Sequence, residues 1–210
     1  MKWNRVPLGP LQTNCYWIEK DQSVLLFDPG EEGARLVKHF EQQGLTVAAI
    51  LLTHAHFDHI GAVDIVRERF NCPVYLHEKE KNWLTDASLN GSERFGLGKI
   101  VCKDGPSNIL TKEQVMELEG ITLNVLHTPG HSPGSVSFYC KELGIVIAGD
   151  TLFQQGIGRT DLYGGSMDVL MKSIHTKLLT LPEDTVVLSG HGNETTIGWE
   201  MEENPYLNGF

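Results

Sequence analysis

A group of metal-binding side chains follows a short aliphatic run in the first third of the chain. Residues 51–63 read LLTHAHFDHIGAV, which places His54, His56, Asp58 and His59 within six positions. Alternate side chains of an extended backbone share one face, so the first two histidines are expected to lie together. Imidazole and carboxylate suit Zn²⁺, Fe²⁺ or Mn²⁺, whereas closed structural zinc sites usually recruit cysteine. The segment predicts part of a metal site that needs further ligands; the alternative is a solvated polar turn.

Eight short apolar runs predict β-strands, because their lengths, β-branched residues and Gly, Pro or Asp boundaries are typical of strands. The predicted strands are 15–19, 24–28, 48–52, 73–77, 121–126, 135–140, 144–148 and 185–189. The predicted helices are 31–43, 60–70 and 167–180. Strands early and late in the chain with helices between them indicate sheets with helices packed outside.

Length and composition favour one globular domain, which we expect to cover residues 1–210. The net charge of −10, from 27 acidic and 17 basic residues, argues against a general nucleic-acid-binding surface. The N-terminal segment has no apolar stretch after its basic residues, and no apolar run approaches the ~18 residues that span a bilayer. We therefore expect a cytoplasmic protein that has no membrane partner.

Four cysteines are scattered along the chain, at Cys15, Cys72, Cys102 and Cys140, and none forms a CxxC pair. This spacing argues against a disulfide framework or a thiolate zinc site and favours reduced thiols. We interpret each cysteine as a small buried apolar side chain.

Four predicted strands each end shortly before a histidine or an aspartate. AAILLT leads to His54, ITLNVLHTPG to His131, GIVIAG to Asp150 and TVVLSG to His191. If these ends meet at one edge of the sheets, seven metal-binding side chains converge. They are His54, His56, Asp58, His59, His131, Asp150 and His191. Seven ligands are too many for one tetrahedral ion but suit two ions with open positions for water.

The remaining histidines have no such placement. His39 and His175 fall within predicted helices, His77 ends a predicted strand, and His127 precedes the TPGH turn. We interpret all four as structural or surface residues.

Together these motifs resemble the metallo-β-lactamase superfamily, from DPG at 28–30 through THAHFDH, TPGHSPGS and AGDTLF to SGHG. The resemblance covers most of the chain and implies an α/β fold, an αββα sandwich with metals at one sheet edge. The glyoxalase II-like group is the nearest resemblance, because GDTLF is followed by GIGRTDLYGGS at 156–166 and by GHGNETTIG.

The resemblance also implies a division of the ligands. The first metal would take His54, His56 and His131; the second would take Asp58, His59 and His191; and Asp150 would bridge them. Asp28 matches the family's motif aspartate, which supports the metal loop without binding metal. Its alternative role is that of a turn residue in DPG.

Two departures bear on the substrate. Glyoxalase II proper continues into a helical C-terminal region that helps to bind glutathione, whereas this chain ends with ENPYLNGF. The family's substrate loop carries a basic residue and a tyrosine, and the matching stretch here is Arg159-Thr160-Asp161. Arg159 could meet a substrate carboxylate, but Asp161 stands where the tyrosine is expected, so the glutathione substrate is open.

The expected function is hydrolysis of a small thioester or ester, a small-molecule substrate, by a hydroxide that bridges two metals. Metals lower the pKa of bound water toward ~7, and Asp58 would orient the hydroxide as the catalytic carboxylate. We expect two divalent ions, zinc first, with iron or manganese as alternatives. Two dications less Asp58, Asp150 and one hydroxide leave roughly +1 locally, which favours an anionic substrate.

The sequence leaves three other functions open. GRTD at 158–161 also resembles persulfide dioxygenases, which hold one iron through two histidines and an aspartate. A phosphodiesterase of the same fold is disfavoured by the net charge. A non-catalytic protein stabilised by metal is disfavoured because no cysteine closes the ligand sphere. The stretch 81–105 has no assigned role, and the oligomeric state is not predicted.

Overall fold

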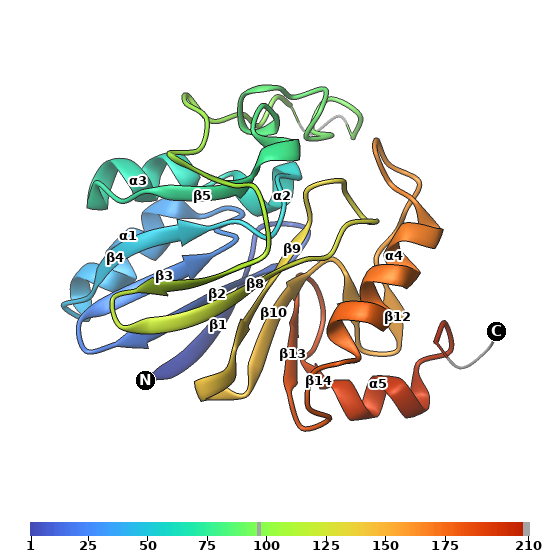
Figure 1. Cartoon of the computed structure of the whole chain (residues 1–210). Coiled ribbons are helices and arrows are strands. Elements are labelled where there is room, and N and C mark those ends of the chain that lie inside the picture. The colour runs from blue at the N-terminus through green and yellow to red at the C-terminus, as the bar shows by residue number, and fades with distance from the viewer. Residues whose placement is uncertain (96–97, 208–210) are drawn as a thin grey trace. The chain divides into compact units, whose positions relative to one another are not determined.

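The computed structural model describes residues 1–95 and 98–207, and the chain forms two compact units. The N-terminal unit comprises Met1–Thr111 with Leu118–Gly120, and the C-terminal unit comprises Lys112–Glu117 and the chain from Ile121 onward. Each unit is built around one six-stranded sheet, coloured blue to green in the first and yellow to red in the second (Figure 1). The expectation of a single domain over residues 1–210 stays a prediction.

The N-terminal sheet has the strand order β1-β2-β3-β4-β5-β6. Its strands are β1 (Lys2–Leu8), β2 (Thr13–Lys20), β3 (Ser23–Phe27), β4 (Thr46–Leu51), β5 (Val74–His77) and β6 (Asn108–Leu110). Its helices are α1 (Gly33–Gln42), α2 (Phe57–Ile60) and α3 (Val63–Phe70), with 3₁₀ turns η1 (Glu78–Glu80) and η2 (Trp83–Thr85). Strands β3 to β6 are parallel, so the segments that follow β3, β4 and β5 leave the sheet at the same edge.

An apolar cluster between this sheet and its helices forms the core of the N-terminal unit. Leu36 and Phe40 lie one turn apart on α1, so they share the buried face of that helix. They pack with Trp17 of β2, Leu26 of β3 and Val66 of α3. The rings of Trp17 and Phe40 meet edge to face, with centroids 5.5 Å apart and planes at 89°.

The C-terminal sheet has the strand order β14-β13-β10-β9-β8-β7. Its strands are β7 (Gln114–Leu118), β8 (Ile121–His127), β9 (Val136–Cys140), β10 (Ile145–Gly149), β13 (Val186–Ser189) and β14 (Thr195–Thr196). The other elements are the 3₁₀ turn η3 (Lys141–Leu143), the hairpin of β11 (Leu152–Phe153) and β12 (Gly156–Ile157), and helices α4 (Met167–Ser173), η4 (Ile174–Leu178, π-helical) and α5 (Ile197–Glu203).

Three strands of the C-terminal sheet run in the same direction. β9 is antiparallel to both β8 and β10, and β13 is parallel to β10. The segments after β8, β10 and β13 therefore leave at one edge. Leu170, Ile174 and Leu178, spaced by four residues along α4 and η4, pack with Val146 and Val187 of the sheet.

All eight predicted strands are confirmed, as are the helices that we expected at 31–43, 60–70 and 167–180. The second of these helices begins only at Val63, after α2, and the third becomes π-helical at Ile174. The short helix α5 and the strands β1, β6, β7, β11, β12 and β14 were not predicted from the sequence. β1 is an edge strand that contains Pro7. Nowhere in the described ranges is there a helix long and apolar enough to cross a bilayer.

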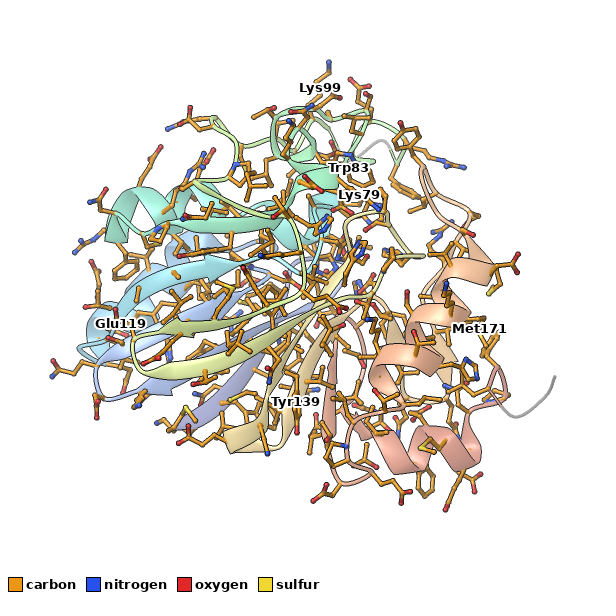
Figure 2. All side chains as sticks on the ribbon, viewed as in Figure 1. Lys79, Trp83, Lys99, Glu119, Tyr139 and Met171 are labelled. Carbon is orange, nitrogen blue, oxygen red and sulfur yellow. The ribbon has the colours of Figure 1, made fainter. Side chains whose placement is uncertain are left out.

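The stretch 81–105 contains η2 and irregular segments, and residues 96 and 97 of it lie outside the described residues. Trp83, labelled in Figure 2, is 3% exposed and belongs to the N-terminal core cluster. Asn90 is fully buried and donates its side-chain amide to the backbone carbonyls of Trp83 and Ile100. This stretch is therefore anchored to the core through Trp83 and held together by Asn90.

The four cysteines are free thiols and all are buried, which confirms our interpretation of them. Burial disfavours the charged thiolate and raises each thiol pKa. The pKa of Cys72 rises to about 11 and that of Cys102 to about 12.

We expect these thiols to react slowly in the folded protein, because the thiolate is the nucleophile and burial suppresses it. At pH 8 a small disulfide reagent should modify Cys72 on the order of a hundredfold more slowly than an unfolded thiol of ordinary pKa. The measurement is the rate of thiol modification in buffer and in denaturant. Equal rates in the two conditions would contradict the burial.

Truncation of Phe40 should destabilise the protein strongly, because its fully buried ring would leave a cavity beside α1. Phe40→Ala should lower the free energy of unfolding by about 3–5 kcal/mol in urea titrations. Val115→Ala is the control, since Val115 is 67% exposed, and it should change that free energy by about 0.5 kcal/mol or less. Similar losses for both variants would argue against the packed cluster around Phe40.

Candidate metal centre

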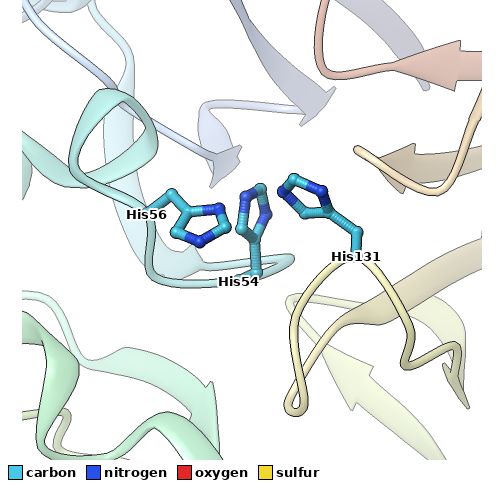
Figure 3. A group of neighbouring side chains, drawn as sticks. All are labelled: His54, His56 and His131. Carbon is cyan, nitrogen blue, oxygen red and sulfur yellow. The ribbon is translucent and has the colours of Figure 1, made fainter. Parts of the chain in front are cut away.

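Three buried imidazoles of the N-terminal unit gather in the segment after β4. His54, His56 and His59 are 1%, 5% and 0% exposed. The ring centroid of His54 lies 4.8 Å from that of His56 and 4.1 Å from that of His59. Figure 3 shows the first two rings extending from this segment. We call these histidines and Asp58 the N-terminal ligand group; their role as metal ligands stays a prediction.

The order of strand, loop and short helix accounts for this gathering. β4 ends at Leu51, and a short loop with a bend at Thr53 leads to His56, which has extended dihedral angles and is the N-cap of α2. Asp58 and His59 occupy the single turn of α2. The loop and the helical turn thus carry four ligand side chains within six residues.

Asp28 supports this segment from the end of β3. Its carboxylate accepts the backbone N–H of Thr53 at 2.8 Å and the Thr53 hydroxyl at 2.7 Å, and lies 3.1 Å from His59 Nδ1. The residue has φ 50°, in the left-handed region that aspartate tolerates better than most residues. Gly30, two positions later, approaches the backbone oxygen of Asp58 so closely that a Cβ would lie 1.9 Å from it. The DPG motif therefore has structural reasons for its aspartate and its glycine.

The Nδ1 atoms of two histidines already have partners in the protein. His59 Nδ1 contacts Asp28, and His54 Nδ1 lies 3.0 Å from the Thr53 hydroxyl. A histidine whose Nδ1 is held in this way presents Nε2 to a metal. His59 Nε2 lies 3.5 Å from Asp58 Oδ2, whose orientation is set by a 2.8 Å hydrogen bond from the Thr13 hydroxyl.

Three residues that hold this segment were not predicted from the sequence. Thr13 binds Asp58, the Glu80 carboxylate accepts the backbone N–H of Ala55 at 2.7 Å, and the Asn90 carbonyl accepts that of Phe57 at 3.1 Å. Glu80 is fully buried, although HEKE has the composition of a charged surface turn. The only sequence signal for Glu80 is its place just after a predicted strand, the same signal that identified the histidines.

The C-terminal ligand group consists of His131, Asp150 and His191. Asp150 directly follows β10, and His191 comes two residues after β13, the parallel neighbour of β10. A backbone hydrogen bond of 2.8 Å from Gly190 to Gly149 joins the two segments. His131 lies in the loop after β8 (Figure 3). The parallel strand ends thus account for the approach of residues that are distant in sequence.

A single carboxylate oxygen lies between the two imidazoles of this group. Asp150 Oδ2 is 3.6 Å from His131 Nε2 and 3.5 Å from His191 Nε2. Donors at ~2.0–2.1 Å from a tetrahedral ion lie roughly 3.3–3.4 Å apart, so each pair is spaced like two ligands of one ion. The Nδ1 of His131 lies 2.8 Å from the backbone carbonyl oxygen of Arg159, a partner typical of metal-binding histidines. The donor set of each unit therefore fits a divalent transition metal.

Arg159, the predicted substrate-binding residue, lies on the segment after β12. Its guanidinium donates to both carboxylate oxygens of Asp161 at 2.7 Å. This bidentate pair is about half exposed, and the neighbouring carboxylate raises the pKa of Arg159 above its ordinary value. A substrate carboxylate would have to compete with Asp161 for this cation.

The four histidines interpreted as structural or surface residues have other contacts. The His39 ring meets Trp17 edge to face, and His77 Nδ1 accepts the backbone N–H of Lys79. His127 Nε2 lies 3.2 Å from the Pro133 carbonyl oxygen, and His175 Nδ1 lies 2.8 Å from that of Met171. These contacts agree with the structural and surface roles.

A small pocket opens beside Asp58 in the N-terminal unit. Its volume is about 140 Å³. Its walls are largely apolar and include Leu8, Leu11, Phe57 and Ile100. The pocket therefore offers apolar contacts next to a carboxylate of the ligand group.

Comparisons with known proteins identify the family. The family model of the metallo-β-lactamase superfamily matches residues 8–191. The probable metallo-hydrolase YqgX of Bacillus subtilis strain 168 is 54% identical over 210 residues, covering 100% of this chain and 99% of its own. The hydroxyacylglutathione hydrolase GloC of Haemophilus influenzae is 37% identical over 207 residues, covering 97% and 96% of the two chains.

Solved structures give the same result for the fold. The crystal structure of BLEG-1 B3 metallo-β-lactamase matches with a TM-score of 0.97 and 51% identity, covering 99% of this chain and 100% of that one. The structure of TTHA1623 in a di-iron-bound form matches with a TM-score of 0.86 and 43% identity, covering 97% and 100%. The expected fold class, α/β of the metallo-β-lactamase type, is confirmed. We conclude that the chain belongs to the metallo-β-lactamase superfamily.

Proposed function

We propose that this chain is a dinuclear metal-dependent hydrolase of small thioesters or esters, similar in activity to glyoxalase II. The observation that carries the proposal is the place of Asp150 Oδ2, at nearly equal distances from His131 Nε2 and His191 Nε2. A carboxylate oxygen close to two imidazoles would be shared by two ions if each imidazole held one of them. The di-iron form of TTHA1623, at 43% identity, supports the same stoichiometry.

In this proposal the two ligand groups together bind two ions. His54, His56 and His131 would hold the first ion, Asp58, His59 and His191 would hold the second, and Asp150 would contribute to both. Zinc is the first choice for ligands that are all imidazole or carboxylate, and iron or manganese suits them also. The supporting contacts of His59 with Asp28 and of His131 with the Arg159 carbonyl favour a metal-binding role for both imidazoles.

The residues of the chain have separate tasks in the reaction. When bound, the two ions supply Lewis acidity toward a carbonyl oxygen and lower the pKa of water toward ~7. Asp58, held by the Thr13 hydroxyl, orients the attacking water and accepts a hydrogen bond from it. A thiolate leaves readily without protonation, so a thioester needs no strong general acid from the chain.

Several observations favour a small anionic substrate. The pocket beside Asp58 has room for a small apolar group, which suits the acyl part of a thioester. Arg159 offers a cation for a substrate carboxylate in competition with Asp161. The name of the relative GloC, a hydroxyacylglutathione hydrolase at 37% identity, supports a thioester of a small thiol peptide. The protein in this proposal is cytoplasmic and acts on a small molecule.

An iron-dependent persulfide dioxygenase is the second candidate, because GRTD at 158–161 occurs in a loop that touches His131. The two candidates differ in metal content and in the use of oxygen. The hydrolase needs two ions and no oxygen, whereas the dioxygenase needs one iron and consumes oxygen.

The purified protein should carry about two equivalents of transition metal and cleave thioesters without oxygen. His54→Ala and Asp150→Ala should each abolish this activity, because each removes a metal ligand. The measurements are metal analysis and anaerobic assays of thioesters, with a persulfide under air and a β-lactam as alternative substrates. The β-lactam is included because BLEG-1, at 51% identity, is named a B3 metallo-β-lactamase.

Three results would overturn the proposal: full turnover by metal-free protein, oxygen uptake with a single iron, or cleavage of the β-lactam alone. Glu203→Ala is a control. Glu203 is an exposed residue of α5, and its substitution removes one charge. It should leave both metal content and rate unchanged.

Asp28→Asn should weaken metal binding without removing a ligand. The amide of asparagine keeps one acceptor oxygen and has an NH₂ group, a donor, in place of the other. The contacts with Thr53 and His59 therefore cannot all persist. Loss of such a supporting partner typically lowers metal affinity about 10–100-fold. Competition with a chromophoric zinc chelator measures the change. Asp21→Asn, at an exposed site of the same unit, should bind zinc as the parent does; equal affinities for Asp28→Asn and the parent would argue against this supporting role.

A further inference from the structure

A buried carboxylate on α5 binds to two other segments of the C-terminal unit. Glu200 is 0% exposed. Its Oε1 accepts the Thr195 hydroxyl at 2.5 Å, and its Oε2 accepts the Gln155 backbone N–H at 2.9 Å and the Asn204 side-chain amide at 2.7 Å. A buried polar group is costly unless it is hydrogen-bonded, and three donors contact the Glu200 carboxyl group. The proposed reaction gives no direct task to Glu200.

Asn204 completes the link to the hairpin of β11 and β12. It is also fully buried, and its amide donates to the Gly156 carbonyl at 3.1 Å as well as to Glu200. Glu200 therefore binds the N–H of Gln155, while Asn204 binds the carbonyl of the next residue. The turn of the hairpin is held on both its donor and its acceptor side by residues of the C-terminal helix and its end.

The turn needs such support because of its backbone conformation. Gln155 has φ 55°, in the left-handed region that L-residues other than Asn and Asp seldom adopt. The strands that flank the turn contribute only two residue pairs, Leu152 with Ile157 and Phe153 with Gly156. A two-pair hairpin is not stable by itself. The hydrogen bonds from α5 are therefore part of what keeps the turn in place.

The hairpin leads directly to the C-terminal ligand group. Gly158 donates its backbone N–H to Thr151 at 3.2 Å. It lies so close to Asp150 that a Cβ would be 1.9 Å from the Asp150 backbone oxygen and 3.1 Å from the His131 Cβ. The next carbonyl, that of Arg159, contacts His131 Nδ1. Displacement of the hairpin would therefore move the acceptor that sets the orientation of the His131 ring.

We propose that Glu200, assisted by Asn204, is a positioning residue that orients His131 through the β11–β12 hairpin. The inference rests on the proposed function for the assignment of His131 as a metal ligand. Glu200 acts through geometry, because its two oxygens have distinct tasks: Oε2 holds the hairpin and Asn204, and Oε1 holds Thr195.

This division of tasks makes two substitutions informative. In Glu200→Gln the amide oxygen can replace Oε2 and keep both donors, while the amide nitrogen donates to the Thr195 hydroxyl, which can accept as well as donate. Glu200→Ala leaves the Gln155 N–H and one amide hydrogen of Asn204 without this acceptor. A role through geometry thus predicts that Gln substitutes for Glu and Ala does not, whereas a role through charge predicts that both fail.

The experiment compares Zn²⁺ binding by metal-free parent, Glu200→Ala, Glu200→Gln and the same-helix control Glu203→Ala, using competition with a chromophoric chelator. We expect Glu200→Ala to bind at least one Zn²⁺ about tenfold more weakly. The Zn²⁺ affinities of Glu200→Gln and Glu203→Ala should remain within about threefold of the parent affinity. This change is smaller than the loss expected when a supporting residue is removed. Urea titrations of the metal-free proteins establish that each variant is folded under the conditions of the assay.

Spectra of protein with ¹⁵N-labelled histidine give a readout that general destabilisation would not move. The Nδ1 resonance of His131, assigned by its loss in His131→Gln, should shift in Glu200→Ala and keep the parent position in Glu200→Gln. Unchanged Zn²⁺ affinity and an unchanged His131 resonance in Glu200→Ala would overturn the inference, as would equal losses in the Ala and Gln variants. Failure to cleave thioesters would instead count against the proposed function, since neither measurement uses turnover.

Discussion

The contact of a buried imidazole with a fixed acceptor at its Nδ1 is the interaction that directs His59 and His131 in the two ligand groups. His59 has the Asp28 carboxylate and His131 has the Arg159 carbonyl. An imidazole held at one nitrogen has both its tautomer and its ring direction set, so that Nε2 is the atom presented to an ion. Without these acceptors a buried histidine ring could rotate. The position of the strand ends alone does not set the direction of the ring.

Parallel strand ends bring ligand residues and their supporting residues together within each unit. In the N-terminal unit β3 delivers Asp28 beside the segment that β4 delivers, because the two strands are parallel neighbours. In the C-terminal unit β10 and β13 do the same for Asp150 and His191. Parallel pairing thus brings together residues far apart in the sequence, and side-chain hydrogen bonds then refine their directions.

Much of this was predictable from particular residues. His54, Asp150 and His191 each follow an apolar run within three residues. The sequence therefore predicts that each of them lies at the edge of a sheet. Glu80 and Glu200 were not predictable, since HEKE and GWEMEE have the composition of exposed turns and helices. Their burial depends on neighbours that come from elsewhere in the chain, Ala55 for the first and Gln155 for the second.

The sequence by itself determined the order of strands and helices, the superfamily and the types of metal-binding residue, because these depend on local periodicity and on motifs with narrow spacing. Only the tertiary structure decided which groups support the ligands, that Arg159 is paired with Asp161, and that the C-terminal helix holds the hairpin beside His131. The reason is physical: a hydrogen bond between distant residues depends on where the chain brings them, and neither local propensity nor residue type encodes that distance.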